Sequence, residues 1–130
     1  MQDRNALVKE QFITLVESGN LPASNIELTP QEVGLSNNDV VSIFESMVMS
    51  RHLDLRSRLM QKKGQSFYTI GSSGHEGNAA YAAAFRPTDM AFLHYRSGAF
   101  AIHRGKQVPG ETSLYDMLLS FAASSEDPIS

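Results

Sequence analysis

The sequence of 130 residues predicts an α/β protein that is rich in helices and holds only part of a sheet. Two observations lead to this fold class. Several segments repeat apolar residues at helical spacing or open with a helix-capping residue, whereas the apolar run of residues 90–93 is the one segment with the character of a buried strand. Because a single strand cannot form a sheet, we expect the helices to pack against further chain or another subunit.

The amino-terminal part predicts one helix and a connector. Residues 5–18 carry apolar side chains at an imperfect helical spacing. Residues 19–35 contain prolines, glycines and several Asn and Ser residues without periodicity, which favours an extended connector. We therefore divide the chain into residues 1–35, the helix and connector, and residues 36–130, the truncated amino-terminal portion of a larger domain.

A long helix is expected over residues 37–62. Ser36 is typical of a helix N-cap, and Asp39 suits the positive end of the helix. Lys62-Lys63-Gly64 is a good stop, because cations favour the carbonyl end and Gly can adopt a left-handed turn. The apolar stripe that we expect to face the core consists of Val40, Phe44, Met47, Val48, Leu55 and Leu59.

The next segment predicts a loop and an alanine-rich helix. Residues 65–74 are rich in Gly and Ser, and Ser73 with Glu76 has the spacing of a capping box for a helix over residues 78–85. The alanines of that helix give it a thin surface, which allows close packing against a neighbouring backbone.

Two shorter helices are expected after the predicted strand. The first covers residues 97–104 and is closed by Gly105. The second is capped by Thr112 or Ser113 and carries apolar residues on one side.

Composition excludes several function classes. The formal net charge of -3, from 11 basic and 14 acidic side chains, argues against a general nucleic-acid binder. The absence of cysteine excludes disulfides, thiolate metal sites and redox pairs. No apolar run approaches the roughly 20 residues that span a bilayer, and the polar first residues lack a signal core. A cytoplasmic location is expected.

The strongest candidate site follows the predicted strand at His94-Tyr95-Arg96. Open α/β sheets bind ligands at the carboxyl ends of their strands. The forked donors of Arg96 suit a diphosphate, and Tyr95 offers a hydroxyl or a stacking face. Two alternatives stay open: Arg96 is a surface residue paired with a carboxylate, and His94 is a hydrogen-bonded structural residue.

The loop from Phe67 to Gly77 is the second candidate. A Gly- and Ser-rich loop before a helix presents free N–H groups to an anion, but Glu76 partly cancels that field. The loop is therefore expected to shape a cavity wall with Phe67 and Tyr68, or else to be an ordinary entry to a helix.

Two other groups of polar residues carry no predicted site. The four histidines are scattered and show no metal-ligand spacing. The charged face of the long helix is expected to be solvated, and it consists of Arg51, His52, Asp54, Arg56 and Arg58.

In order and spacing, the motifs of residues 36–122 resemble the alpha subunit of the thiamine-diphosphate-dependent 2-oxo acid dehydrogenases, decarboxylating component. The Ser-Phe-Tyr version of the loop resembles the branched-chain enzymes more than the pyruvate enzymes. The motifs are Gln65-Ser66-Phe67-Tyr68, Gly74-His75-Glu76-Gly77, Arg86-Pro87-Thr88-Asp89 and His94-Tyr95-Arg96-Ser97-Gly98.

The resemblance implies a thiamine-diphosphate-binding fold and a set of site residues. Tyr95 and Arg96, with His94 beside them, would contact the diphosphate of the cofactor. The pocket for the 2-oxo acid would be lined by Phe67, Tyr68 and Ser97. The family holds its Mg²⁺ through a Gly-Asp-Gly segment and a later Asn, which this sequence lacks, so the metal ligands are expected outside this chain and no catalytic residue is assigned within it.

The parent reaction implied by the resemblance is oxidative decarboxylation of a branched-chain 2-oxo acid with acyl transfer to a lipoyl group. Expected partners are the 2-oxo acid, a beta subunit or downstream beta-like domain, and the lipoyl acyltransferase of the complex, in an oligomer. The chain alone is expected to be an inactive fragment of this oxidoreductase. The alternatives are a non-catalytic helical interaction module that retains subunit contacts, and a pyruvate or acetoin enzyme of the same cofactor class.

Overall fold

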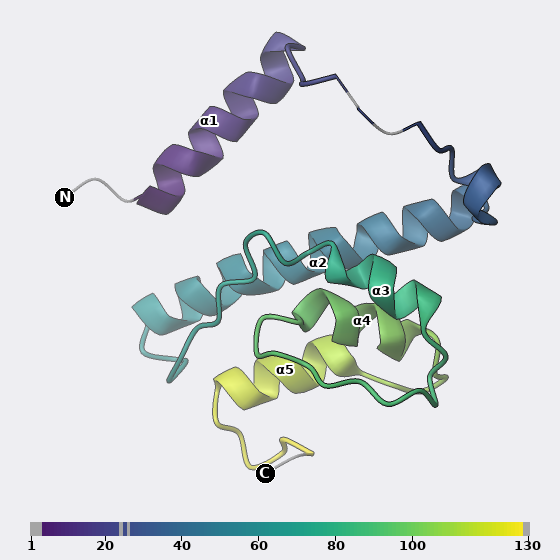
Figure 1. Cartoon of the computed structure of the whole chain (residues 1–130). Helices are drawn as coiled ribbons and strands as arrows, with labels where there is room; N and C mark the ends of the chain where they lie inside the picture. The colour runs from purple at the N-terminus through teal and green to yellow at the C-terminus, as the bar shows by residue number, and fades with distance from the viewer. Residues whose placement is uncertain (1–3, 24, 26, 129–130) are drawn as a thin grey trace. The chain divides into compact units, whose positions relative to one another are not determined.

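The computed structural model describes residues 4–23, 25 and 27–128, and these residues form five α-helices and no β-strand (Figure 1). The chain divides into two units, Met1–Val33 and Gly34–Ser130. The first unit contains α1 (Arg4–Ser18) and the short 3-10 helix η1 (Gln31–Val33), and the second contains α2 (Asn37–Lys62), α3 (Asn78–Ala84), α4 (Gly98–Lys106) and α5 (Ser113–Phe121). The helix-rich part of the predicted fold class is therefore confirmed.

The predicted strand over residues 90–93 is wrong. These residues run as irregular chain, and Phe92 is 95% exposed where a buried strand was expected. A strand needs a second segment to accept and donate its backbone hydrogen bonds, and no other described segment forms a strand beside it. The α/β sheet thus remains an expectation from the sequence.

The caps of α2 are confirmed, because they depend on residues that are neighbours in the sequence. Ser36 Oγ accepts a hydrogen bond from the Asp39 backbone N–H at 3.2 Å, and the Asp39 carboxylate accepts from the Ser36 N–H at 2.8 Å. Hydrogen bonds from the hydroxyl and the N–H of Ser36 hold the pKa of Asp39 below its usual range. At the other end, Gly64 adopts a left-handed φ of 69°.

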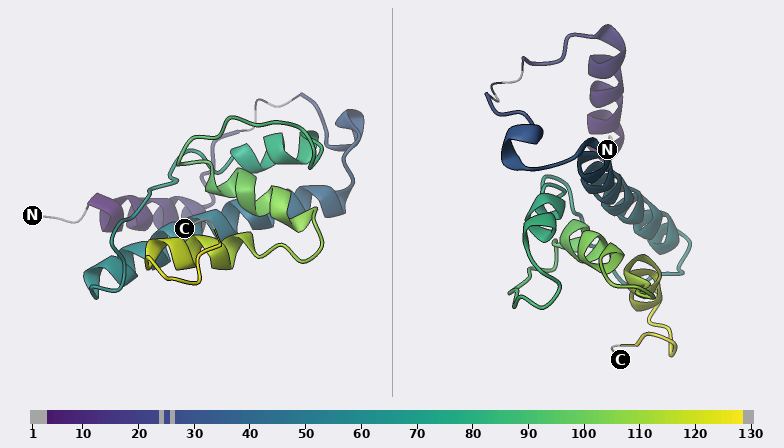
Figure 2. Two further views of the ribbon diagram at one scale, coloured as in Figure 1. Left: turned by 90° about the horizontal axis from the view of Figure 1, so that it is seen from below. Right: turned by 90° about the vertical axis from the view of Figure 1, so that its right-hand side faces the viewer.

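The face that α2 buries is not the predicted apolar stripe. Phe44 is 62% exposed. The helices α3, α4 and α5 all contact α2 and lie on one side of it (Figure 2). Serines are small, so the facing helices can approach closely, and this tertiary packing overrides the apolar spacing. The buried face of α2 consists of Ser46, Ser50, Leu53, Asp54 and Ser57.

The core of the second unit is small. It centres on Leu53 of α2, Ile102 of α4 and Phe121 of α5. Alanines also pack closely: Ala79 and Ala82 of α3 and Ala99 of α4 are inaccessible to solvent, in agreement with the close packing expected for this alanine-rich helix. The partly buried residues that pack around the core are Met49, Ile70, Leu114, Met117 and Leu118.

Two local predictions need correction. The capping box of Ser73 and Glu76 does not form, because α3 begins at Asn78 and the Glu76 carboxylate accepts from the Gly74 N–H at 2.8 Å instead. Gly105 does not close α4, since the helix continues to Lys106. Gly105 instead allows α4 and α5 to approach closely, because an added Cβ would overlap Ser113, the first residue of α5.

Candidate functional site

A cavity of about 230 Å³ brings together most of the residues that the sequence singles out. It lies between the middle of α2, the loop before α3, the turn that leads into α4, and the end of α5. The cavity is lined by Ser50, Leu53, Asp54, Tyr68, Ile70, Ser72, Leu93, His94, Tyr95, Arg96, Ser97, Gly98, Ala101, Met117, Ser120 and Phe121.

The turn of residues 94–97 presents its side chains to this cavity. The Ser97 N–H donates to the His94 carbonyl at 2.9 Å, and Ser97 Oγ accepts from the His94 N–H at 3.3 Å. His94 Nδ1 accepts from the Arg96 N–H at 3.3 Å. His94 and Ser97 therefore fix the turn through hydrogen bonds, and the turn sets where Tyr95 and Arg96 lie.

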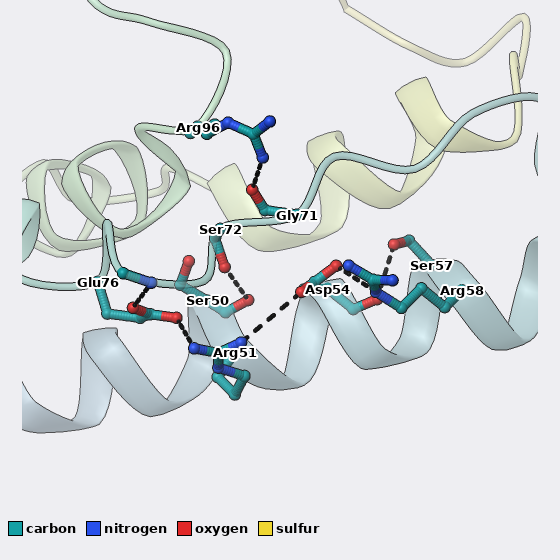
Figure 3. Close-up of polar contacts among 10 residues, drawn as sticks. Ser50, Arg51, Asp54, Ser57, Arg58, Gly71, Ser72, Glu76 and Arg96 are labelled. Carbon is teal, nitrogen blue, oxygen red and sulfur yellow. Dashed lines mark hydrogen bonds and ion pairs between the residues drawn. The ribbon is translucent and has the colours of Figure 1, made fainter. Parts of the chain in front are cut away.

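Arg96 is half-buried and reaches across to the loop before α3. Its Nη1 donates to the carbonyl of Gly71 (Figure 3), and its guanidinium lies 5.0 Å from the centre of the Tyr95 ring. Such a cation–π contact favours a fixed guanidinium plane. Tyr95 and Arg96 thus lie in the same wall of one cavity. Among the described residues Arg96 pairs with no carboxylate, so the alternative of such a partner is not supported.

Of the two aromatic residues predicted for the substrate pocket, Tyr68 lines the cavity and Phe67 does not. Tyr68 lines the cavity, its hydroxyl lies 2.7 Å from Ser120 Oγ, and its ring meets Phe121 edge-on at 5.2 Å. Phe67 is 79% exposed and lies outside the cavity lining. The Phe67 backbone N–H, which donates to the Phe121 carbonyl at 3.1 Å, ties the loop to α5 instead.

At the α2 wall of the cavity, a chain of charges that includes Asp54 joins α2 to the loop before α3 (Figure 3). Asp54, only 3% exposed, accepts from Arg58 Nε at 2.9 Å and lies 3.9 Å from Arg51 Nη1. Arg51 Nη2 also pairs with Glu76 of the loop. Buried carboxylates are stable only when they are paired, so this chain of charges fixes both the rotamers of the arginines and the position of the loop.

The expectation of a solvated charged face overlooked Asp54 and Arg58. Their spacing of four residues is the spacing of a helical ion pair. Ser46, Ser50 and Ser57 share the face of Asp54, and this periodic set of small polar residues is the signal that could have identified a buried face. A search for apolar residues at helical spacing misses such a face, since it depends on hydrophobicity and not on the size of the side chains.

The cavity combines one cation with one carboxylate and several hydroxyls. Its lining residues include Arg96, Asp54, Tyr68 and Tyr95. Within the part of the chain that the structure describes, no group of three or more His, Cys, Asp or Glu residues could hold a metal ion. Ligand pockets usually enclose about 300–1,000 Å³, so a cavity of about 230 Å³ suits one end of a cofactor-sized molecule.

No family model, curated protein or solved structure matches this chain. None of the described helices combines the length and apolar character needed to cross a membrane.

Proposed function

We propose that this chain is the amino-terminal part of the alpha subunit of a thiamine-diphosphate-dependent 2-oxo acid dehydrogenase, and that its cavity receives the diphosphate end of the cofactor. The single observation that carries the proposal is the joint placement of Tyr95 and Arg96 in one cavity wall. The ordered motifs from Gln65 to Gly98 support the same family.

The residues present fit the anionic end of the cofactor. Arg96 is permanently charged and offers several N–H donors in one plane, which matches the geometry of phosphate oxygens. The Tyr95 hydroxyl offers a further donor from the same cavity wall. Thiamine diphosphate, when bound, supplies the carbanion-stabilising chemistry of the parent reaction; these side chains would hold and orient its diphosphate.

The remainder of the site would come from other polypeptide. The cavity is smaller than the whole cofactor needs, and the described residues offer no cluster for Mg²⁺. The proposed partners are therefore a beta subunit or beta-like domain and the segment that carries the metal ligands. The proposed substrate is a branched-chain 2-oxo acid, which a panel of 2-oxo acids including pyruvate and acetoin would test in the assembled enzyme.

A second candidate function has its own support. Large apolar side chains lie exposed on α2 and on the segment before α4, notably Val41, Phe44 and Phe92. Extended apolar surface of this kind marks interaction sites. A non-catalytic module that keeps only subunit contacts would share this surface and would bind no cofactor.

Cofactor affinity distinguishes the two functions. The measurement is calorimetric titration of thiamine diphosphate with Mg²⁺ into the complex of this chain with the polypeptide that supplies the metal ligands. Arg96→Ala should weaken binding by about tenfold or more, because a charge-assisted hydrogen bond contributes about 1.5–3 kcal/mol. The control is Arg86→Ala, which removes an exposed arginine paired with Asp89. Equal affinity for the Arg96 variant and the parent complex would refute the site.

A further inference from the structure

Two guanidinium groups converge on Gly71. A Cβ placed on this glycine would lie 3.0 Å from Arg58 Nη2 and 3.5 Å from Arg96 Nη1. The two arginines come from different elements, α2 and the turn before α4, so their meeting is a property of the tertiary fold. Like charges this close repel each other, and an anion between them would turn the repulsion into attraction.

Each guanidinium is anchored at one edge and keeps donors at another. Arg58 uses Nε for the bond to Asp54 Oδ1, and its two Nη groups have no further partner within the described part of the chain. Arg96 uses Nη1 for the Gly71 carbonyl. These bonds hold both side chains in place. Because an arginine has five N–H donors, several donors remain on each guanidinium for a ligand.

The local charge also favours an anion. The connected group contains the guanidiniums of Arg51, Arg58 and Arg96, against the carboxylates of Asp54 and Glu76. One positive charge is left over. The two carboxylates therefore do not balance the three guanidiniums, although Asp54 itself lines the cavity beside Arg96.

We propose that Arg58 and Arg96 form a two-arginine clamp for a phosphate or diphosphate group, and that position 71 lacks a side chain to leave room between them. The inference rests on the proposed function and deepens it: Arg58 is named as the second cation for the diphosphate. Arg58 acts through direct contact with the anion, and Asp54 is a positioning residue that holds its Nε.

The test uses the chain as it is and inorganic pyrophosphate as the probe, titrated by calorimetry at low ionic strength. Gly71→Ala should raise the Kd several-fold while the fold is kept, since the added Cβ meets the far ends of two side chains and no backbone atom. Its matched control is Gly77→Ala, where a Cβ meets nothing within 4 Å. Arg58→Gln and Arg96→Gln should each raise the Kd by about tenfold, the scale of one charge-assisted hydrogen bond.

The outcomes separate this inference from the proposed function. If Arg96→Gln weakens pyrophosphate binding while Gly71→Ala and Arg58→Gln leave it unchanged, the clamp is refuted and the cofactor site stands. If pyrophosphate binding depends on both arginines and the assembled complex fails to bind thiamine diphosphate, the clamp stands and the proposed function is refuted. Absence of saturable pyrophosphate binding by the parent chain also overturns the clamp. Circular dichroism shows whether each variant is folded. If Arg58→Gln does not fold, the effect of Gly71→Ala on pyrophosphate binding decides whether the clamp exists.

Discussion

Replacing Gly105 by alanine sets two effects of opposite sign against each other. Gly105 lies inside α4, where alanine is favoured over glycine by about 0.5–1 kcal/mol. However, the new Cβ would overlap Ser113 Oγ and lie 3.1 Å from Ser113 Cβ. The hydroxyl can rotate away, but the Ser113 Cβ is fixed to the first residue of α5, so the two helices must separate slightly.

Steric crowding should outweigh helix propensity here. Overpacking a close contact costs about 1–3 kcal/mol, so we expect Gly105→Ala to lower the free energy of unfolding by about 1 kcal/mol net. Urea denaturation followed by circular dichroism measures the change. Gly77→Ala is the control, because its Cβ meets nothing within 4 Å and its φ of -56° suits alanine.

A double-mutant cycle isolates the cause. Ser113→Gly removes the two atoms that the new methyl group would crowd. Combining it with Gly105→Ala should therefore restore stability by about 1 kcal/mol relative to additivity. Strict additivity, or a Gly105→Ala variant more stable than the parent chain, would show that α4 and α5 do not approach as described.

Three further perturbations test other contacts. Asp54→Asn should lower the free energy of unfolding by about 1–3 kcal/mol, because it weakens a buried, charge-assisted hydrogen bond. Asp89→Asn, in an exposed ion pair, should lower it by less than about 1 kcal/mol. Urea denaturation measures both, and equal effects would contradict the buried network. Burial and, secondarily, a neighbouring lysine lower the pKa of His103, so its stabilising effect is present above its unfolded pKa of about 6.5 and is lost as pH falls toward the folded value. The midpoint of thermal unfolding should accordingly fall more between pH 7.5 and 5.5 for the parent chain than for His103→Gln. Tyr68→Phe should cost about 1 kcal/mol through loss of the bond to Ser120, and an unchanged urea midpoint would show that this hydroxyl does not hold the loop.

Features that depend on sequence neighbours were predictable. The cap of α2 needs only Ser36 and Asp39, and its end needs only Gly64, so the bounds of this helix follow from local chemistry. That Tyr95 and Arg96 lie close together was predictable for a similar reason, since both belong to one tight turn that local hydrogen bonds hold.

Features that depend on distant partners were not predictable. The segment of residues 90–93 has the composition of a strand, but a strand exists only when another segment pairs with it. The buried serine face of α2, from Ser46 to Ser57, is decided by the alanines of α3 and α4. Arg58 was placed on a solvated face because only the fold reveals that it meets Arg96 at Gly71.

The most direct test of the proposed site is a crystal structure of the assembled complex with thiamine diphosphate and Mg²⁺. The account predicts diphosphate oxygens within hydrogen-bond distance, about 2.7–3.2 Å, of the Arg96 guanidinium and close to the Tyr95 hydroxyl. A diphosphate bound elsewhere, with Arg96 still donating to the Gly71 carbonyl alone, would contradict it.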